Sequence, residues 1–174
     1  MDSGLEKLAK ALRAEIEAIP TAAGQWHPEG KWCADEIVEH LYLTYTGTAK
    51  GFERVLAAGK PQASAKTLRL HVRTLVVCGF GYLPEGRKAP KHSTPQGLPP
   101  EQVRAEVAAK IAAMDEMITR CERQFGEGRL LDHPILGALT AEQWRKFHLV
   151  HGLHHLKQIR RLRKRAVGED HESD

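Results

Sequence analysis

Cysteine, aromatic residues and long apolar runs are all scarce in this sequence. The three cysteines are far apart and form no CxxC pair, a pattern typical of a reduced, cytosolic protein; they are Cys33, Cys78 and Cys121. Phe, Trp and Tyr make up only 6% of the chain, too few for the stacking platforms that bind single-stranded nucleic acid. The most apolar run, LVVCGFGYL, is about half as long as a membrane span, and the charged N-terminus has no signal-peptide core. We therefore expect a soluble, cytoplasmic protein with no membrane partner.

A basic surface extending over the whole molecule is not indicated either. The formal net charge is +4, and the excess is concentrated near the C-terminal end, just before the acidic segment GEDHESD. The clustered basic residues are Arg160, Arg161, Arg163, Lys164 and Arg165. Cations in a final helical turn also stabilise the helix dipole, so a solvated helix end explains the cluster, and a nucleic-acid partner is not expected.

Apolar residues recur at three- and four-residue steps along five segments, and no segment shows the period-two alternation of a strand. We predict helices over about 3–19, 34–58, 64–82, 100–125 and 141–166, with Ser3 capping the first and a Thr140–Gln143 capping box beginning the last. The segments 85–99 and 126–139 are rich in proline or glycine and are predicted to be loops. The pattern predicts an all-α fold, a four-helix bundle with an additional short helix and long loops. We expect one domain over residues 1–166 and a polar tail over 167–174.

The predicted last helix carries the stretch HGLHHLKQI, with three histidines in five residues. On a helical wheel, His151 falls in the middle of the apolar stripe that includes Trp144 and Phe147, and His155 lies at its margin. Two histidines four residues apart on a buried face can direct their rings at one point, as metal ligands do. The bland alternative is a pair of core histidines with hydrogen-bonded rings.

A catalytic metal needs a third protein ligand, and His40 on the second long helix is the best candidate. Its wheel position is in line with Thr44, Gly47 and Gly51, whose small side chains either leave room for a cavity or allow close helix contact. His148 is a weaker candidate, as a fourth ligand or an outer contact. The remaining histidines, in loops or at less suggestive positions, are weaker still: His27, His71, His92, His133 and His171. A di-iron centre is disfavoured because the last helix has no acidic residue between Glu142 and Glu169.

Three segments together resemble the DinB-like superfamily, which includes the bacillithiol S-transferases. These are WHPEGKWCADEIVEHL, APKHSTP and HPILGALTAEQWRKFHLVHGLHHLKQI, and the similarity spans roughly residues 5–163. The resemblance implies a bundle of up-down-down-up connectivity, commonly a homodimer, with one divalent metal ion, usually zinc or nickel. It assigns the ligands to His40, His151 and His155 and makes His154 a neighbour of the site. The chain departs from the family at Gln158, where S-transferase-like members carry another histidine, and at Cys33, where a serine often caps the helix.

Activation of a low-molecular-weight thiol for S-transfer to a small-molecule substrate is therefore the expected chemistry, since a cation held by neutral imidazoles favours deprotonation of a thiol. Metal-assisted hydrolysis is one alternative, and a non-enzymatic stress or interaction protein is another. His148, His154 and Gln158 are the candidates for side chains that orient the ligands. Cys33, at a helix start, is a minor candidate for a thiol of lowered pKa. A second apolar line on the last helix (Leu149, Leu153 and Leu156) supports a homodimer if no other element covers it.

Overall fold

The computed structural model describes residues 1–65, 67–84 and 89–168, and these are predominantly helical, as the sequence predicts. The elements, in chain order, are α1 (Ser3–Glu17), α2 (Thr21–Gly24), α3 (Ala34–Ala58), α4 (Leu68–Thr74), the π-helix η1 (Leu75–Gly79), the 3-10 helix η2 (Lys91–Ser93), α5 (Pro100–Phe125), β1 (Arg129–His133), β2 (Gly137–Thr140) and α6 (Ala141–Ala166). The proposed tail over 167–174 falls largely outside the described residues, as does the start of the long loop at 85–88.

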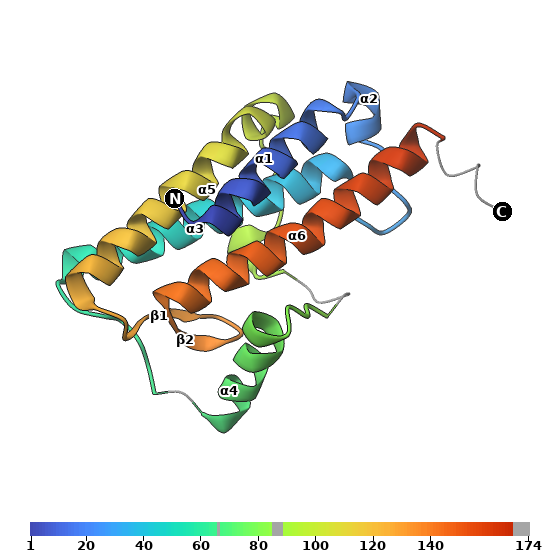
Figure 1. The fold of residues 1–174 in the computed structure, drawn as a ribbon. Coiled ribbons are helices and arrows are strands. Elements are labelled where there is room, and N and C mark those ends of the chain that lie inside the picture. Colours follow the sequence, from blue (N-terminus) through green and yellow to red (C-terminus); the bar gives the residue numbers. More distant parts are fainter. Residues whose placement is uncertain (66, 85–88, 169–174) are drawn as a thin grey trace.

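The four longest of these helices, α1, α3, α5 and α6, pack side by side around the core (Figure 1). Helix α3 packs against α5 and α6, and α1 packs against α5 and α6 on the other side. Helices α1 and α6 run in one direction, and α3 and α5 run in the other. The largest fully buried side chains come from all four helices and from the strands: Tyr45, Phe52, Leu5, Leu8, Leu12, Leu41, Ile111, Met114, Ile118, Leu130, Leu139 and Ile159.

The beginnings of the helices agree with the sequence at α6 and differ at α1. Thr140 and Gln143 form the predicted capping box, with each side chain accepting a hydrogen bond from the other's backbone N–H at 3.2 Å. At α1 the cap is Asp2 and not Ser3, because the Asp2 carboxylate accepts from the backbone N–H groups of Gly4 and Leu5. A carboxylate at a helix N-terminus also stabilises the helix dipole.

A two-stranded antiparallel sheet occupies the segment that the sequence predicted to be a loop. Strands β1 and β2 pair around a turn that begins at His133, and Leu130 and Leu139 bury their side chains completely. Gly137 adopts a φ of 70°, a left-handed conformation that favours glycine. The prediction of no strand was wrong because each strand is only four or five residues long and the pairing is irregular between Arg129 and Leu131.

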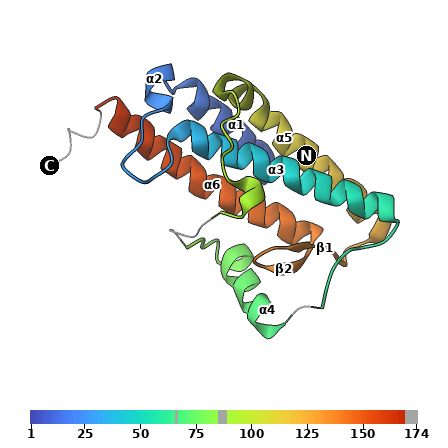
Figure 2. The same ribbon diagram turned by 180° about the vertical axis from the view of Figure 1, so that it is seen from behind.

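The third predicted helix is shorter than expected and lies outside the four packed helices. It begins at Leu68 and changes from α- to π-helical geometry at Leu75. Figure 2 shows α4 beside the hairpin, apart from the four long helices. The segment is attached to the rest of the chain by Val77, which is buried in the core, and by Cys78 Sγ, which donates to the Gln143 carbonyl at 3.5 Å. The Thr74 hydroxyl, which donates to Leu70 O at 2.8 Å, also lies 3.3 Å from the Leu136 carbonyl. This segment therefore covers the hairpin and the start of α6.

Helix α1 covers most of the second apolar line on α6. Leu156 is buried, Leu149 packs beside Gly4, and Leu153 keeps 42% of its surface exposed. The two helices approach closely at Gly152, where an added Cβ would clash with the side chain of Leu8 on α1. The apolar line is therefore covered within the chain except at Leu153, and the homodimer stays a prediction. None of the described helices is long and apolar enough to cross a membrane.

Candidate metal centre

Three histidine rings from two helices meet beside the core. His40 comes from α3, and His151 and His155 come from successive turns of α6. The Nε2 atom of His151 lies 3.1 Å from Nε2 of His40 and 3.1 Å from Nε2 of His155. All three side chains are buried, with exposed fractions of 4%, 8% and 9% for His40, His151 and His155. The structure thus brings together the three residues that the sequence and the family resemblance singled out, close enough to hold a metal ion.

Hydrogen bonds at the outer nitrogens turn the Nε2 lone pairs of two rings toward the centre. His40 Nδ1 lies 2.7 Å from the backbone carbonyl of Ser93, and His155 Nδ1 lies 2.7 Å from Oε1 of Gln158. A carbonyl oxygen can only accept, so in both rings Nδ1 carries the proton and Nε2 is free to act as a ligand. The amide nitrogen of Gln158 in turn lies 3.1 Å from Nε2 of His154.

The loop that orients His40 is itself held by the neighbouring residue on α3. The carboxylate of Glu39 accepts hydrogen bonds from the backbone N–H groups of Gln96 at 2.6 Å and Gly97 at 3.3 Å. Glu39 and His40 therefore bind the same loop, one through the backbone N–H groups and the other through the Ser93 carbonyl.

The arrangement of the third ring shows that the cluster fits a cation. His151 Nδ1 is buried and has no hydrogen-bond partner among the described residues. If that atom carries the proton, three lone pairs face one another at the centre. If Nε2 carries it, a single proton must serve two acceptors and Nδ1 remains an unpaired acceptor. A divalent ion satisfies all three Nε2 atoms at once, and Zn–N bonds of about 2.0–2.1 Å in a tetrahedral site place such nitrogens about 3.3 Å apart.

Burial keeps the three imidazoles in the neutral form that ligation requires. The pKa of His155 is lowered to about 3, first by burial and then by the neighbouring His40. Burial is also the main cause that lowers the pKa of His40, and it lowers the pKa of His151 well below its ordinary value. A metal therefore has no proton to displace from these rings near neutral pH.

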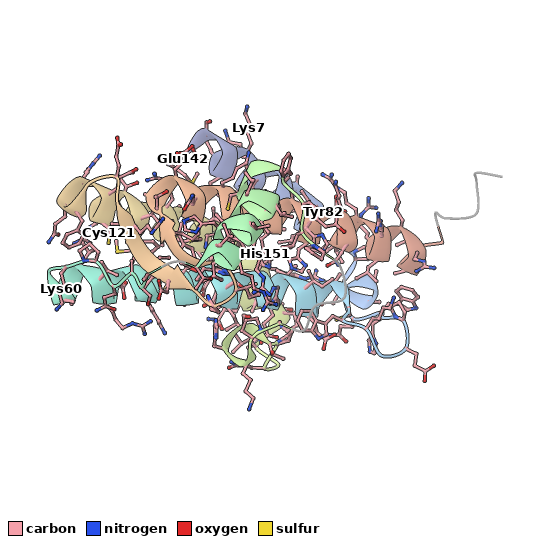
Figure 3. The ribbon with its side chains drawn as sticks, turned by 90° about the horizontal axis from the view of Figure 1, so that it is seen from below. Lys7, Lys60, Tyr82, Cys121, Glu142 and His151 are labelled. Carbon is pink, nitrogen blue, oxygen red and sulfur yellow. The ribbon has the colours of Figure 1, made fainter. Side chains whose placement is uncertain are left out.

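A cavity of about 530 Å³ adjoins the three histidines. Its wall includes Thr44, Gly47 and Gly51 of α3, so of the two alternatives for these small residues, a cavity or a close helix contact, the structure shows a cavity. A Cβ added at Gly47 would have only His92 Cδ2 within 4 Å, at 3.9 Å, whereas one at Gly51 would meet Leu131 Cδ2 at 2.9 Å. Figure 3 shows His151 near the middle of this side of the molecule, and α3 and α6, which carry the three histidines, pack against each other.

His148 lies behind the cluster and not in it. Its ring is completely buried against the rings of Tyr45, Trp144 and Phe147, with centroid separations of 5.5, 5.6 and 5.0 Å. Neither ring nitrogen has a hydrogen-bond partner in the described part of the chain, and burial lowers the pKa to about 3. Of the side chains proposed to orient the ligands, Gln158 does so directly and His154 contacts Gln158.

His133 is the residue of this site that sequence reasoning underrated. The hairpin brings it from an apparent loop into the cavity wall, where only 9% of its surface is exposed. The available signal in the sequence was HPILG, which forms the turn of the hairpin. It indicates a position for His133 only when the segments on both sides are known to pair as strands. Of the other weak candidates, His92 also lines the cavity, and His171 lies outside the described residues.

The cysteines take no part in the cavity. Cys33 caps α3 as expected, with Sγ accepting from Glu36 N at 3.4 Å, but burial raises its pKa. The expectation of a lowered pKa was wrong because loss of hydration outweighs the backbone N–H contact. None of the three cysteines lines the cavity, and Figure 3 shows Cys121 far from His151.

Comparison with known proteins finds one matching family model. The family model described as "Protein of unknown function (DUF1569)" matches residues 5–162, which span most of the chain and contain the complete histidine cluster. No curated protein and no solved structure matches the chain.

Proposed function

For this chain, which belongs to the DUF1569 family, we propose a divalent-metal-dependent enzyme whose single metal ion is held by His40, His151 and His155. The observation that carries the proposal is the meeting of three buried histidines, with Nε2 of His151 lying 3.1 Å from Nε2 of both His40 and His155 and the outer nitrogens of those two rings fixed as donors. An all-imidazole set suits zinc or nickel.

The surroundings of the cluster favour catalysis over a purely structural metal. Structural zinc sites are closed by four protein ligands, whereas catalytic sites use three and leave one position open. In this chain the described residues supply three convergent histidines, and the cavity reaches the cluster. A divalent ion at this point would lower the pKa of a thiol or water in contact with it and so supply a nucleophile near neutral pH.

The residues around the cluster pack against the histidine rings and fix their orientation. The ring of Phe147 stacks on His151 with a centroid separation of 5.3 Å, and Trp32 packs against His40 at 5.3 Å. Ser93 and Gln158 hold the rings of His40 and His155 in their ligating orientation. Loss of such outer contacts typically weakens metal binding by about 10- to 100-fold.

We propose S-transfer as the reaction class. Because no cysteine of the chain lines the cavity, the thiol must come from a ligand of low molecular weight. The thiol gives up its proton to water, its sulfur forms a bond to an electrophilic carbon of the second substrate, and the leaving group departs with the electron pair of the broken bond and takes up a proton from water. Hydrolysis would differ only in that water takes the place of the thiol.

The proposal extends to the fold family. The opposite directions of the α1/α6 and α3/α5 pairs support a four-helix bundle of up-down-down-up connectivity, the architecture of the DinB-like superfamily. A homodimer in a reducing cytoplasm belongs to the same proposal, and the three free cysteines fit that compartment.

Metal analysis of protein purified without a histidine tag tests the site. We expect about one equivalent of zinc or nickel in the wild type and its loss in the His151→Ala and His155→Ala variants. The matched control is His154→Ala, which removes the adjacent histidine and should retain the metal. Absence of stoichiometric metal from the wild type under several growth supplements would refute the proposal, and retention of full metal by both ligand variants would refute the assignment.

A further inference from the structure

We infer that His133 presents an Nε2–H hydrogen-bond donor to the ligand in the cavity, and that this ligand carries a carbonyl or carboxylate oxygen as the acceptor. The inference rests on the proposed function, since it takes the cavity to be the ligand site. It adds a substrate-positioning residue from the hairpin to a site otherwise built by α3 and α6.

His133 is placed at the end of β1, in the wall of the cavity that adjoins the three ligands. Its ring packs on Phe147 with a centroid separation of 4.2 Å and on Trp144 at 5.3 Å. The same Phe147 ring stacks on His151. His133 and His151 therefore contact one shared aromatic ring, which places His133 close to the proposed metal position.

The turn of the hairpin determines which nitrogen of His133 carries the proton. Nδ1 lies 3.1 Å from the backbone nitrogen of Ile135 and 3.2 Å from that of Leu136, and both of these N–H groups donate to it. A backbone N–H can only donate, so Nδ1 must be the unprotonated nitrogen. The neutral ring therefore has its proton on Nε2.

That Nε2–H group has no acceptor in the described part of the chain, yet it is not sealed in the core. The fully buried nitrogens that lack partners belong to other side chains, including both nitrogens of His148, and Nε2 of His133 is not one of them. The small exposed fraction of His133 thus includes this nitrogen, and the residue lines the cavity. A nearly buried donor that faces a cavity is completed by an acceptor on a ligand.

Burial further suits His133 to this role, because it lowers the pKa to about 4, with His92 as a smaller cause. Near neutral pH the ring is a neutral donor of fixed tautomer. Such a donor can form a hydrogen bond to either a carbonyl or a carboxylate oxygen. The bond to the charged carboxylate is the stronger of the two.

The variant that isolates the donor is His133→Asn. The Oδ1 atom of asparagine takes the place of Nδ1 and accepts from the turn, as Asn does in many turns, while the distal donor is removed. The matched variant His133→Gln places an amide N–H near the position of Nε2 and tests whether the donor alone can be restored. Retained protection of the Ile135 and Leu136 backbone amides from hydrogen exchange in His133→Asn shows that both still donate and that the turn is intact.

Three thiols serve as probes for the zinc-loaded protein, measured by calorimetry: 3-mercaptopropionate, 3-mercaptopropionamide and ethanethiol. They share the sulfur and differ in carrying a carboxylate, a carbonyl or no oxygen acceptor. In His133→Asn we expect binding of the acid to weaken roughly tenfold or more and that of the amide roughly threefold, with ethanethiol unaffected. In His133→Gln we expect part of the loss to be restored.

The tautomer is read independently from the imidazole nitrogen resonances of the metal-free protein, where a proton on Nε2 of His133 is expected. A proton on Nδ1 would overturn the inference. Equal losses for all three thiols, or no loss for the two oxygen-bearing ones, would overturn it as well and leave the metal site standing. Failure of every thiol to bind the zinc-loaded wild type would overturn both the inference and the proposed S-transfer. This outcome is distinguished from the others because it appears in the wild type and not only in the His133 variants.

Discussion

Replacement of His148 by leucine should make the protein less sensitive to acid. His148 is fully buried, and its pKa of about 3 lies far below the ordinary value of 6.5. Below pH 6.5 the unfolded chain binds a proton at this residue that the folded chain does not bind until about pH 3. The stability that His148 contributes in its neutral form is therefore fully present above pH 6.5 and is lost as the pH falls toward 3.

The size of the effect follows from the pH interval. Each pH unit below 6.5 costs about 1.4 kcal/mol, so between pH 7 and pH 5 the free energy of unfolding should fall by about 2 kcal/mol because of His148 alone. His148→Leu removes this contribution and also removes two buried nitrogens that have no partner among the described residues. An unpaired buried polar group costs about 1–3 kcal/mol, so the variant should be at least as stable as the wild type at pH 7.

Urea unfolding of the metal-free protein, followed by circular dichroism at pH 7 and pH 5, measures both quantities. Tyr45→Phe is the control, because it changes the same buried layer but exchanges no proton in this interval; burial raises the pKa of Tyr45 further above it. The wild type and Tyr45→Phe should lose the same stability on acidification, and His148→Leu about 2 kcal/mol less. If His148→Leu shows the wild-type loss, the reasoning about its buried neutral ring is refuted.

Three further predictions concern the site and the assembly. Gln158→Leu removes the hydrogen bond to His155 and should weaken zinc binding by roughly tenfold or more in a competition titration with a chelator, whereas equal affinity would show that the ring needs no orientation. Gly47→Leu should narrow the cavity beside His40 and weaken thiol binding, while Gly47→Ala, whose Cβ meets nothing closer than 3.9 Å, should retain binding and gain about 0.5–1 kcal/mol of stability in urea unfolding. Light scattering at micromolar concentration should report a dimer, and a monomer would remove that part of the proposal.

The parts of the structure that the sequence predicted are those whose residues are close together in the chain. The ends of α3, α5 and α6 agree with the predicted bounds because long helices repeat the same apolar spacing over many turns. The pair His151 and His155 follows from helical spacing alone. Spacing identified His40 only as the best third candidate; the resemblance to a known family gave it the role of a ligand.

The parts that the sequence did not predict depend on contacts between distant segments. The hydrogen bond from His40 to Ser93 joins residues 53 positions apart, and no local pattern indicates it. The role of His133 depends on β1 and β2, whose short strands leave too few residues for alternation to be recognised. Helix α4 is shorter than predicted because apolar spacing does not reveal where the geometry changes to π-helical at Leu75.

The double attachment of the 93–97 loop to Glu39 and His40 makes the order of that loop part of the metal equilibrium. A cation that binds His40 holds its ring in the orientation that also contacts Ser93. The Glu39 contacts to the same loop come from the adjacent residue of α3. By linkage, metal binding stabilises the closed loop by the same factor by which loop closure strengthens metal binding. Slower hydrogen exchange of the Gln96 amide on addition of zinc would record this coupling without any substrate, so the loop can serve as an internal reporter of occupancy.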